Sequence, residues 1–237
     1  MAYFIKEKLL PSLIVIALLV LCSFVTQPLL KLANISNSNA TKTVIPQGTG
    51  AGVAFGILGG YRTLIADFIW IKGYVDWERK NLAGCMSAIE LATTIDPDSI
   101  FYWRFGASII AFDTPHWIIE QLAPVSKEKE KAIRLRQARQ AIRFLNRALK
   151  MHPNNTELLI QKGQIAISIG DFRLAEECYE EIVKKPEPLI FSRRIYAAVL
   201  QKNGKKEKAK EVLRGIIKDL EPDNPILPRL KQELGER

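Results

Sequence analysis

The sequence is poor in the side chains that most often bind metals or perform acid–base catalysis at neutral pH. Among its 237 residues it has only two histidines and three cysteines. Cys22, Cys85 and Cys178 lie far apart, and none belongs to a Cys-x-x-Cys pair. A structural metal site needs several such ligands at short spacings. We therefore expect no metal and no cofactor, and we interpret the cysteines as small buried thiols.

The residues of a catalytic centre are also scarce. Asp113-Thr114-Pro115-His116 is the only polar cluster of catalytic character, and we place it in a loop. A nucleophile and a second base, which catalysis would need beside it, are missing from the pattern. The glycine-rich stretch 48–60 follows no strand and precedes no Gly-Lys-Ser/Thr, so it does not predict a phosphate-binding loop. The sequence thus predicts a protein that is not an enzyme.

Basic and acidic residues are balanced in one half of the chain and not in the other. Residues 1–124 hold nine Lys and Arg against nine Asp and Glu, whereas residues 125–237 hold 25 against 16. The net charge of +9 therefore arises in the second half. Such an asymmetry bears on the choice of partner and says little about the fold.

One long hydrophobic run follows a short polar tail at residues 1–8. Leu9–Leu30 contains 22 residues without a charge. As a helix it would span roughly 33 Å, enough to cross a bilayer core of about 30 Å. We interpret it as a transmembrane helix or an uncleaved signal anchor. Two alternatives stay open: a cleaved signal peptide, although no small-x-small site follows the run, and a lipoprotein signal, although Leu21 precedes Cys22 where a small residue is expected.

The basic residues of the tail predict the topology. Lys6, Lys8 and the terminal amine favour a cytoplasmic N-terminus. We therefore expect a single-pass protein of a bacterial inner membrane, with the rest of the chain on the outer, periplasmic side. Residues 31–60 are rich in Asn, Ser, Thr and Gly, and we expect them to form a linker.

A second apolar stretch, Val53–Ile71, follows the first. Arg62 and Asp67 fall inside it, and two charges in the middle of a lone span are costly. We expect this stretch to form a helix at the start of the folded domain instead of a second membrane span.

A recurring helical hairpin predicts the architecture of the remaining chain. Glu157–Ile169 and Phe172–Lys185 place apolar residues at helical spacing, and Gly170-Asp171 breaks the pattern between them. Small residues recur at an interval of 34, in the pairs Gly170 and Gly204, and Ala175 and Ala209. A fixed period of this length is typical of an array of helix–turn–helix repeats.

This hairpin resembles a tetratricopeptide repeat. With Thr156 as position 1, Gly163, Ala175 and Tyr179 match the small, small and aromatic residues of positions 8, 20 and 24. Small residues there let the two helices approach closely. The resemblance implies an all-α fold, a right-handed solenoid of about four hairpins preceded by the transmembrane helix. The stretch 58–70 is similar to that of uncharacterised bacterial membrane-anchored proteins with such repeats.

The same phase divides the domain 61–237 into hairpins. The repeats would span about 66–98, 99–155, 156–189 and 190–223, with a capping segment at 224–237. The second repeat is roughly 23 residues too long for the pattern. We expect these residues to form an insertion between a first helix at Ser99–Phe112 and a second at Lys131–Lys150, because Ser126–Lys131 looks like a charged run without a helix cap.

The resemblance also implies where a partner would bind. In tetratricopeptide arrays the first helices of successive hairpins line a concave groove. Its positions carry over to Trp70, Tyr74, Trp77, Trp103, Gln164, Ser168, Arg194, Gln201 and Lys202. Aromatic anchors backed by Arg and amides suit a peptide-binding hot spot. We expect a protein or peptide partner in a membrane-associated complex; the alternative is that the aromatic residues fill the core.

A stripe of basic residues provides a second candidate surface, on the helix expected at Lys131–Lys150. Its members step by three or four residues: Arg136, Arg139, Arg143, Arg147 and Lys150. One interpretation is attraction to anionic lipid or to an acidic partner, and the other is the solvated face of a repeat helix. Because no aromatic residues interleave the stripe, we do not expect nucleic acid to bind there.

Overall fold

The computed structural model describes residues 50–235, with side chains from residue 61 onward. The predicted tail at 1–8, the predicted span at Leu9–Leu30 and most of the predicted linker lie outside the described residues. Among the helices that are described, none combines the length and apolar character that crossing a membrane would require. The chain divides into two units, 1–61 and 62–237, and the second contains the helical array.

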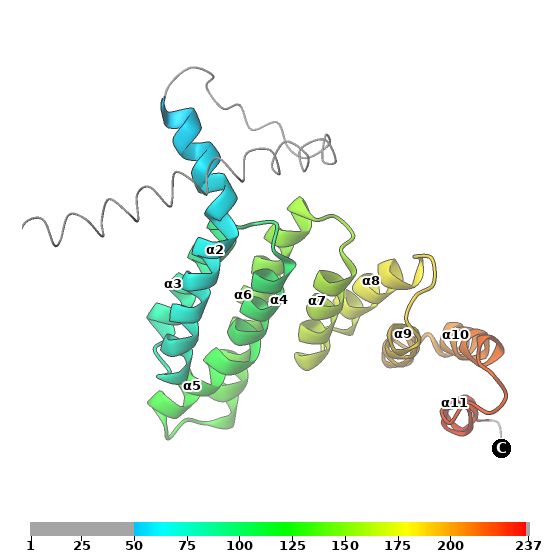
Figure 1. Ribbon diagram of the computed structural model, residues 1–237. Coiled ribbons are helices and arrows are strands. Elements are labelled where there is room, and N and C mark those ends of the chain that lie inside the picture. The colour runs from blue at the N-terminus through cyan, green and yellow to red at the C-terminus, as the bar shows by residue number, and fades with distance from the viewer. Residues whose placement is uncertain (1–49, 236–237) are drawn as a thin grey trace, which may run out of the picture. The chain divides into compact units, whose positions relative to one another are not determined.

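The described part of the chain is all-α and has no strand, as the sequence predicts (Figure 1). Its elements are α2 (Gly50–Glu78), α3 (Leu82–Ile95), α4 (Ile100–Ser108), the π-helical turn η1 (Ile109–Asp113), α5 (Thr114–Leu122), α6 (Lys127–Met151), α7 (Thr156–Ser168), α8 (Phe172–Val183), α9 (Ile190–Lys202), α10 (Lys206–Asp219) and α11 (Leu227–Leu234). Within residues 62–235, hairpins made of neighbouring helices pack against one another in chain order.

The third hairpin, α7 and α8, forms as the repeat pattern predicts. Asn155 and Asp171 cap the two helices, because their side chains accept hydrogen bonds from the amides of Leu158 and Leu174. Gly170 in the turn has a φ of +75°, a conformation that favours glycine. A Cβ atom added to Gly163 would lie 2.7 Å from the Tyr179 ring, so the close helix approach depends on glycine.

The second hairpin corrects three of the predictions. Its extra residues form no separate insertion: they lengthen both helices, into the continuous run Ile100–Leu122 and the 25-residue helix α6. Ser126 caps α6 by accepting a hydrogen bond from the Lys129 amide, so the expectation of an uncapped charged run was wrong. Asp113–His116 is helical, not a loop, because Pro115 stands in the first turn of α5, where its missing N–H is tolerated.

The start of α2 corrects the extent of the linker. Residues 50–60, which we assigned to the end of the linker, are helical. These residues contain no proline, since the last one before them is Pro46. Their glycines lower the stability of a helix but do not prevent it from forming. The helix expected over Val53–Ile71 therefore begins three residues earlier than predicted, at Gly50, and continues to Glu78.

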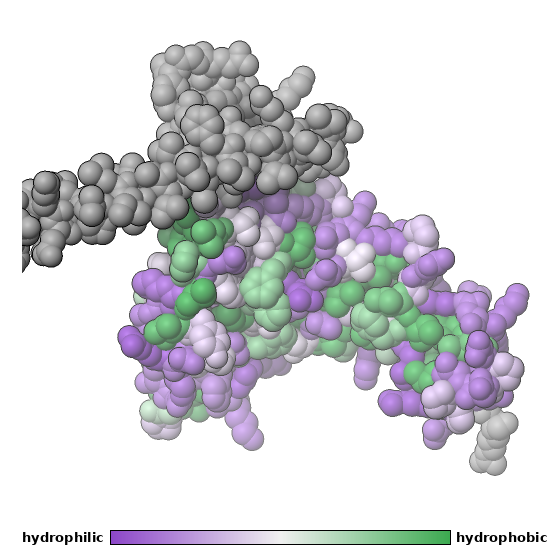
Figure 2. Space-filling model, viewed as in Figure 1, coloured by the Kyte–Doolittle hydropathy of each residue, from purple (hydrophilic) through white to green (hydrophobic). Residues whose placement is uncertain are grey.

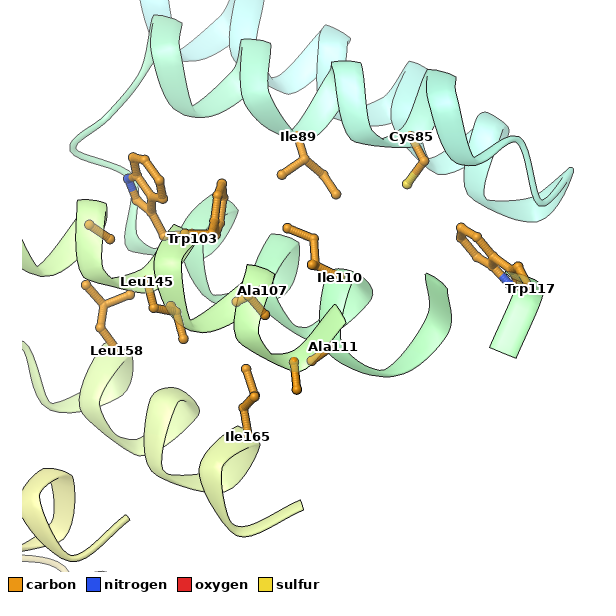
Figure 3. Packing of buried hydrophobic residues seen from close by; sticks show 14 residues of the cluster. Cys85, Ile89, Trp103, Ala107, Ile110, Ala111, Trp117, Leu145, Leu158 and Ile165 are labelled. Carbon is orange, nitrogen blue, oxygen red and sulfur yellow. The ribbon is translucent and has the colours of Figure 1, made fainter. Parts of the chain in front are cut away.

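Two large apolar clusters hold the array together. The first joins α3, α4, η1, α5, α6 and α7, and it is shown in Figure 3. The second joins α7, α8, α9, α10 and α11. Leu230 and Leu234 of α11 are buried in this second cluster, so the last short helix covers the final hairpin. Continuous burial between neighbouring units is the main source of stability in a repeat array.

Candidate functional site

A pocket opens between α2, α3 and the α4–η1 segment. Its volume is about 330 Å³, near the lower end of the range for small-ligand sites. Five aromatic side chains contribute to its wall: Trp70, Tyr74, Trp77, Phe101 and Phe105. Asp113 is the single charged residue among those lining it. The pocket is therefore an apolar site with one carboxylate.

The spacing of residues on α2 explains why three of these rings meet. Trp70, Tyr74 and Trp77 stand at i, i+4 and i+7, so they share one face of the helix. Gly73 lies between them, and a Cβ atom added there would come within 2.6 Å of the Ala88 side chain. The missing side chain thus allows α2 and α3 to approach closely behind the pocket.

The rings pack in two groups. Tyr74 and Trp77 stack with centroids 5.5 Å apart and ring planes inclined by 18°. Trp70 meets Phe101 edge-to-face at 5.5 Å, and Phe101 lies 4.5 Å from Phe105. Tyr74, Phe101 and Phe105 remain exposed. Packing between the rings fixes the positions of these side chains, and part of their surface stays exposed to solvent.

The π-helical turn supplies the carboxylate of the pocket. The Thr114 amide donates to the Ile109 carbonyl, while the Thr114 hydroxyl donates to the Ile110 carbonyl at 2.8 Å. The π-helical turn thus holds one residue more than an α-helical turn, and the Ile110 carbonyl still has a hydrogen-bond partner. Asp113, the last residue of η1, accepts a 2.8 Å hydrogen bond from the Trp77 indole nitrogen. Turns of this kind occur frequently at functional sites.

The predicted aromatic residues do not all lie in the pocket. Trp70, Tyr74 and Trp77 do, but Trp103 is only 4% exposed. Its ring packs 4.7 Å from Phe144, and its indole nitrogen donates to the Pro97 carbonyl. Figure 3 shows Trp103 among the buried residues of the first apolar cluster. Trp103 is a core residue, which corrects its assignment to the groove.

Phe101 and Phe105 also line the pocket, although the sequence pattern did not predict them as binding residues. Residues 101, 102, 103 and 105 are all aromatic, so aromatic side chains leave α4 in several directions and aromatic character alone does not identify the pocket face. The spacing of Phe101, Phe105 and Ser108 repeats that of Trp70, Tyr74 and Trp77. This repetition could have identified the pocket face of α4.

The other predicted partner-binding residues lie outside this pocket. Gln164 and Ser168 are exposed on α7, and Lys202 is exposed at the end of α9. Arg194 and Gln201 line a separate cavity of about 500 Å³ formed by α9, α10 and α11. Arg194 is bound there by Glu233 of α11 at 2.9 Å. The predicted partner-binding residues therefore do not form one site but lie on several helices along the array.

The basic residues of α6 are exposed as a group, but they do not share one environment. Arg147 donates two 2.7 Å hydrogen bonds to Glu90 of α3. Its guanidinium also lies 5.6 Å from the centre of the Trp103 ring and 5.1 Å from that of Phe144. Among the described residues, no carboxylate pairs with the remaining four, Arg136, Arg139, Arg143 and Lys150. Arg147 thus joins helices, whereas the others face solvent.

The two cysteines in the described part of the chain are expected to be unreactive thiols. Cys85, in the pocket wall, and Cys178, in α8, are both buried. Burial raises the pKa of each thiol to about 11, so both stay protonated at neutral pH. Within residues 61–235, no group of three or more His, Cys, Asp or Glu side chains has the arrangement needed to hold a metal ion.

Sequence comparison identifies the third hairpin. Residues 156–184 match the family model described as tetratricopeptide repeat. This range covers α7 and α8, the hairpin from which the repeat pattern is derived. Helices α7 and α8 thus form a tetratricopeptide repeat. No curated protein matches the sequence significantly.

Three solved structures are similar to the chain. YrrB, described as a tetratricopeptide repeat protein with an unusual peptide-binding site, is 16% identical, with 68% of this chain and 88% of that chain covered and a TM-score of 0.35. MamA is 16% identical over 67% and 92%, with a TM-score of 0.34. PilW, described as a widely conserved type IV pilus biogenesis factor, is 12% identical over 76% and 88%, with a TM-score of 0.37.

Proposed function

We propose that the protein is a membrane-anchored scaffold of tetratricopeptide-like hairpins that binds a segment of a partner protein and performs no catalysis. Leu9–Leu30 would be the anchor, in a bacterial inner membrane with the hairpins on the periplasmic side. The observation that supports partner binding best is the aromatic pocket between α2, α3 and α4.

The pocket has the properties of a binding hot spot. Its rings already pack against one another, so little conformational entropy is lost when a ligand binds. Burial of Cys85 keeps its thiol neutral, and the one carboxylate is already bonded to Trp77. A volume of about 330 Å³ would accept one or two apolar side chains. The favoured partner is therefore a segment that inserts an apolar anchor.

Partner capture by two matched variants tests this proposal. Phe105 and Phe112 are both 41% exposed, but only Phe105 lines the pocket. The full chain would be purified from detergent-solubilised membranes together with its bound proteins. We expect Phe105→Ala to lose a partner that Phe112→Ala retains, with similar melting temperatures for the two variants. Equal retention by both, or a loss that follows the melting temperature, would contradict pocket binding.

The solvent-facing part of α6 supports a second candidate function. Arg136, Arg139, Arg143 and Lys150 present positive charge without a carboxylate partner among the described residues. We propose as the alternative that this surface docks on anionic lipid or on an acidic partner. The full chain in neutral vesicles should then capture anionic vesicles at low salt, and Arg139→Glu with Arg143→Glu should reduce the capture. Capture that is insensitive to these changes would count against the alternative.

A further inference from the structure

The outward side of α2 carries apolar side chains that nothing in the described array covers. Leu64, Phe68, Ile71 and Val75 are spaced by four, three and four residues, and thus lie along one line of the helix. Their exposed fractions are 49%, 64%, 59% and 39%. We call these four residues the outer stripe of α2. Apolar side chains are visible on the surface over α2 in Figure 2.

The opposite side of α2 is already used by the fold. Ala66 is fully buried, Gly73 touches Ala88, and Trp70 and Trp77 pack on the core of the neighbouring helices. The helix is therefore apolar on both sides, whereas a helix at the surface of a water-soluble domain keeps one face polar. Helices that are apolar all round are normally buried in protein or in contact with lipid.

Charged side chains do not interrupt the stripe. Arg62 pairs with Asp98, and Asp67 accepts a hydrogen bond from the Tyr102 hydroxyl. Lys72 and Asp76 pair with each other at 2.7 Å. Each charged residue of α2 between positions 62 and 76 is thus neutralised or bonded within the fold. Over about 17 Å of helix the stripe offers apolar atoms alone.

The sequence favours a lipid bilayer over a second copy as the cover. Only 19 residues, 31–49, separate Leu30 at the end of the uncharged run from Gly50 at the start of α2. Even fully extended, they would span no more than about 65 Å. In addition, the chain carries no charge from Thr43 to Tyr61, so no charged side chain would have to lose its hydration where this segment approaches the bilayer. A stripe of four side chains amounts to a few hundred Å², roughly half of the 800 Å² that each partner contributes to a stable dimer.

We infer that α2 lies on the membrane surface, with Leu64, Phe68, Ile71 and Val75 inserted into the boundary between headgroups and acyl chains. This inference rests on the proposed anchor, since the tether supplies the proximity that makes a short apolar stripe sufficient. The stripe and the pocket face lie on different sides of α2. The helix therefore contacts lipid while the aromatic pocket stays open to a partner.

A fluorescent label at the stripe tests the inference in the full chain. Cys22→Ser leaves only the buried Cys85 and Cys178, so a label attaches at an introduced Phe68→Cys. In phosphatidylcholine–phosphatidylglycerol vesicles, an environment-sensitive dye at position 68 should shift to the blue. Brominated acyl chains should quench it several-fold. The matched label at Gln164→Cys, an exposed position of α7, should show neither effect. A label at Ile71→Cys should repeat the result at a second position of the stripe.

The possible failures are distinguishable. A dye at position 68 that stays unquenched, in a chain that floats with the vesicles, overturns the docking and leaves the anchor intact. A chain that does not float overturns the anchor, and the docking with it. A blue shift without quenching, together with a disulfide between two copies when the unlabelled Phe68→Cys chain is oxidised, would identify a second copy as the cover and overturn the bilayer.

Discussion

The indole nitrogen of Trp77 donates a 2.8 Å hydrogen bond to Asp113. The two residues are 36 positions apart, and the bond joins the first helix of the first hairpin to the π-helical turn of the second. Trp77 also meets Trp117 of α5 edge-to-face at 6.4 Å. The aromatic wall of the pocket is thereby fastened to the long second hairpin.

Replacing Asp113 should loosen this wall. In Asp113→Ala the half-buried indole N–H loses its acceptor, and we expect a loss of about 1–2 kcal/mol in unfolding free energy. Asp113→Asn keeps an oxygen that can accept the bond, so its loss should be smaller. Urea unfolding of the full chain in detergent, followed by tryptophan fluorescence, would measure both. Equal losses in the two variants would show that the hydrogen bond contributes nothing.

Gly163 provides a test of close helix packing in the third hairpin. An added methyl group would approach the Tyr179 ring to 2.7 Å, and that ring is fully buried. We expect Gly163→Ala to cost about 1–3 kcal/mol, because the ring has no room to move. The neighbouring Gln164→Ala, at an exposed position, should stay within about 0.5 kcal/mol of the parent protein. Thermal unfolding distinguishes the two; a neutral Gly163→Ala would disprove the packing argument.

The Tyr179 hydroxyl offers a change in the opposite direction. It is buried, and no hydrogen-bond partner for it lies within the described part of the chain. Tyr179→Phe removes the unpaired oxygen and keeps the ring, so stability at neutral pH should be unchanged or higher by up to about 1 kcal/mol. Tyr196→Phe is the matched control, since the Tyr196 hydroxyl donates to Glu180 at 3.3 Å. A clear loss in Tyr179→Phe alone would indicate a partner for its hydroxyl.

The same buried groups predict how stability falls at alkaline pH. Burial raises the pKa of Tyr179 to about 12 from the ordinary 10.0, and the pKa values of Cys85 and Cys178 to about 11 from 9.0. For these acids the folded pKa exceeds the unfolded one, so the unfolded state loses its protons first. The contribution of these three groups to stability should be constant well below about pH 9 and should fall as the pH rises toward 12. Melting temperatures across this range would measure the fall, which should be shallower between pH 10 and 12 in Tyr179→Phe.

The third hairpin could be predicted from local signals. Asn155, Asp171 and Gly170 mark the helix ends, and each acts through atoms within a few residues of itself. Gly163 and Tyr179 face each other because the repeat spacing requires it. Patterns of this kind depend on neighbours along the chain, which is why the sequence alone is sufficient for them.

The second hairpin required information that is not local. In the sequence, Pro115 and the run of charges after Ser126 both look like places where a helix ends. Pro115 instead follows the π-helical turn and stands in the first turn of α5. The charged run begins α6, which Ser126 caps. The burial of Trp103 in preference to Phe101 depends on Phe144, 41 residues later. Aromatic side chains leave α4 in several directions, and the packing of α6 against Trp103 decides which of them is buried.

The two ends of the hairpin array are finished differently. At the C-terminal end, α11 buries Leu227, Leu230 and Leu234, and the described residues of this helix leave no apolar face for another hairpin. At the other end, α2 still presents Leu64, Phe68, Ile71 and Val75. An additional hairpin after α10 would therefore have to displace α11. An additional hairpin before α2 would meet side chains that are already exposed, and it would compete with the bilayer for them.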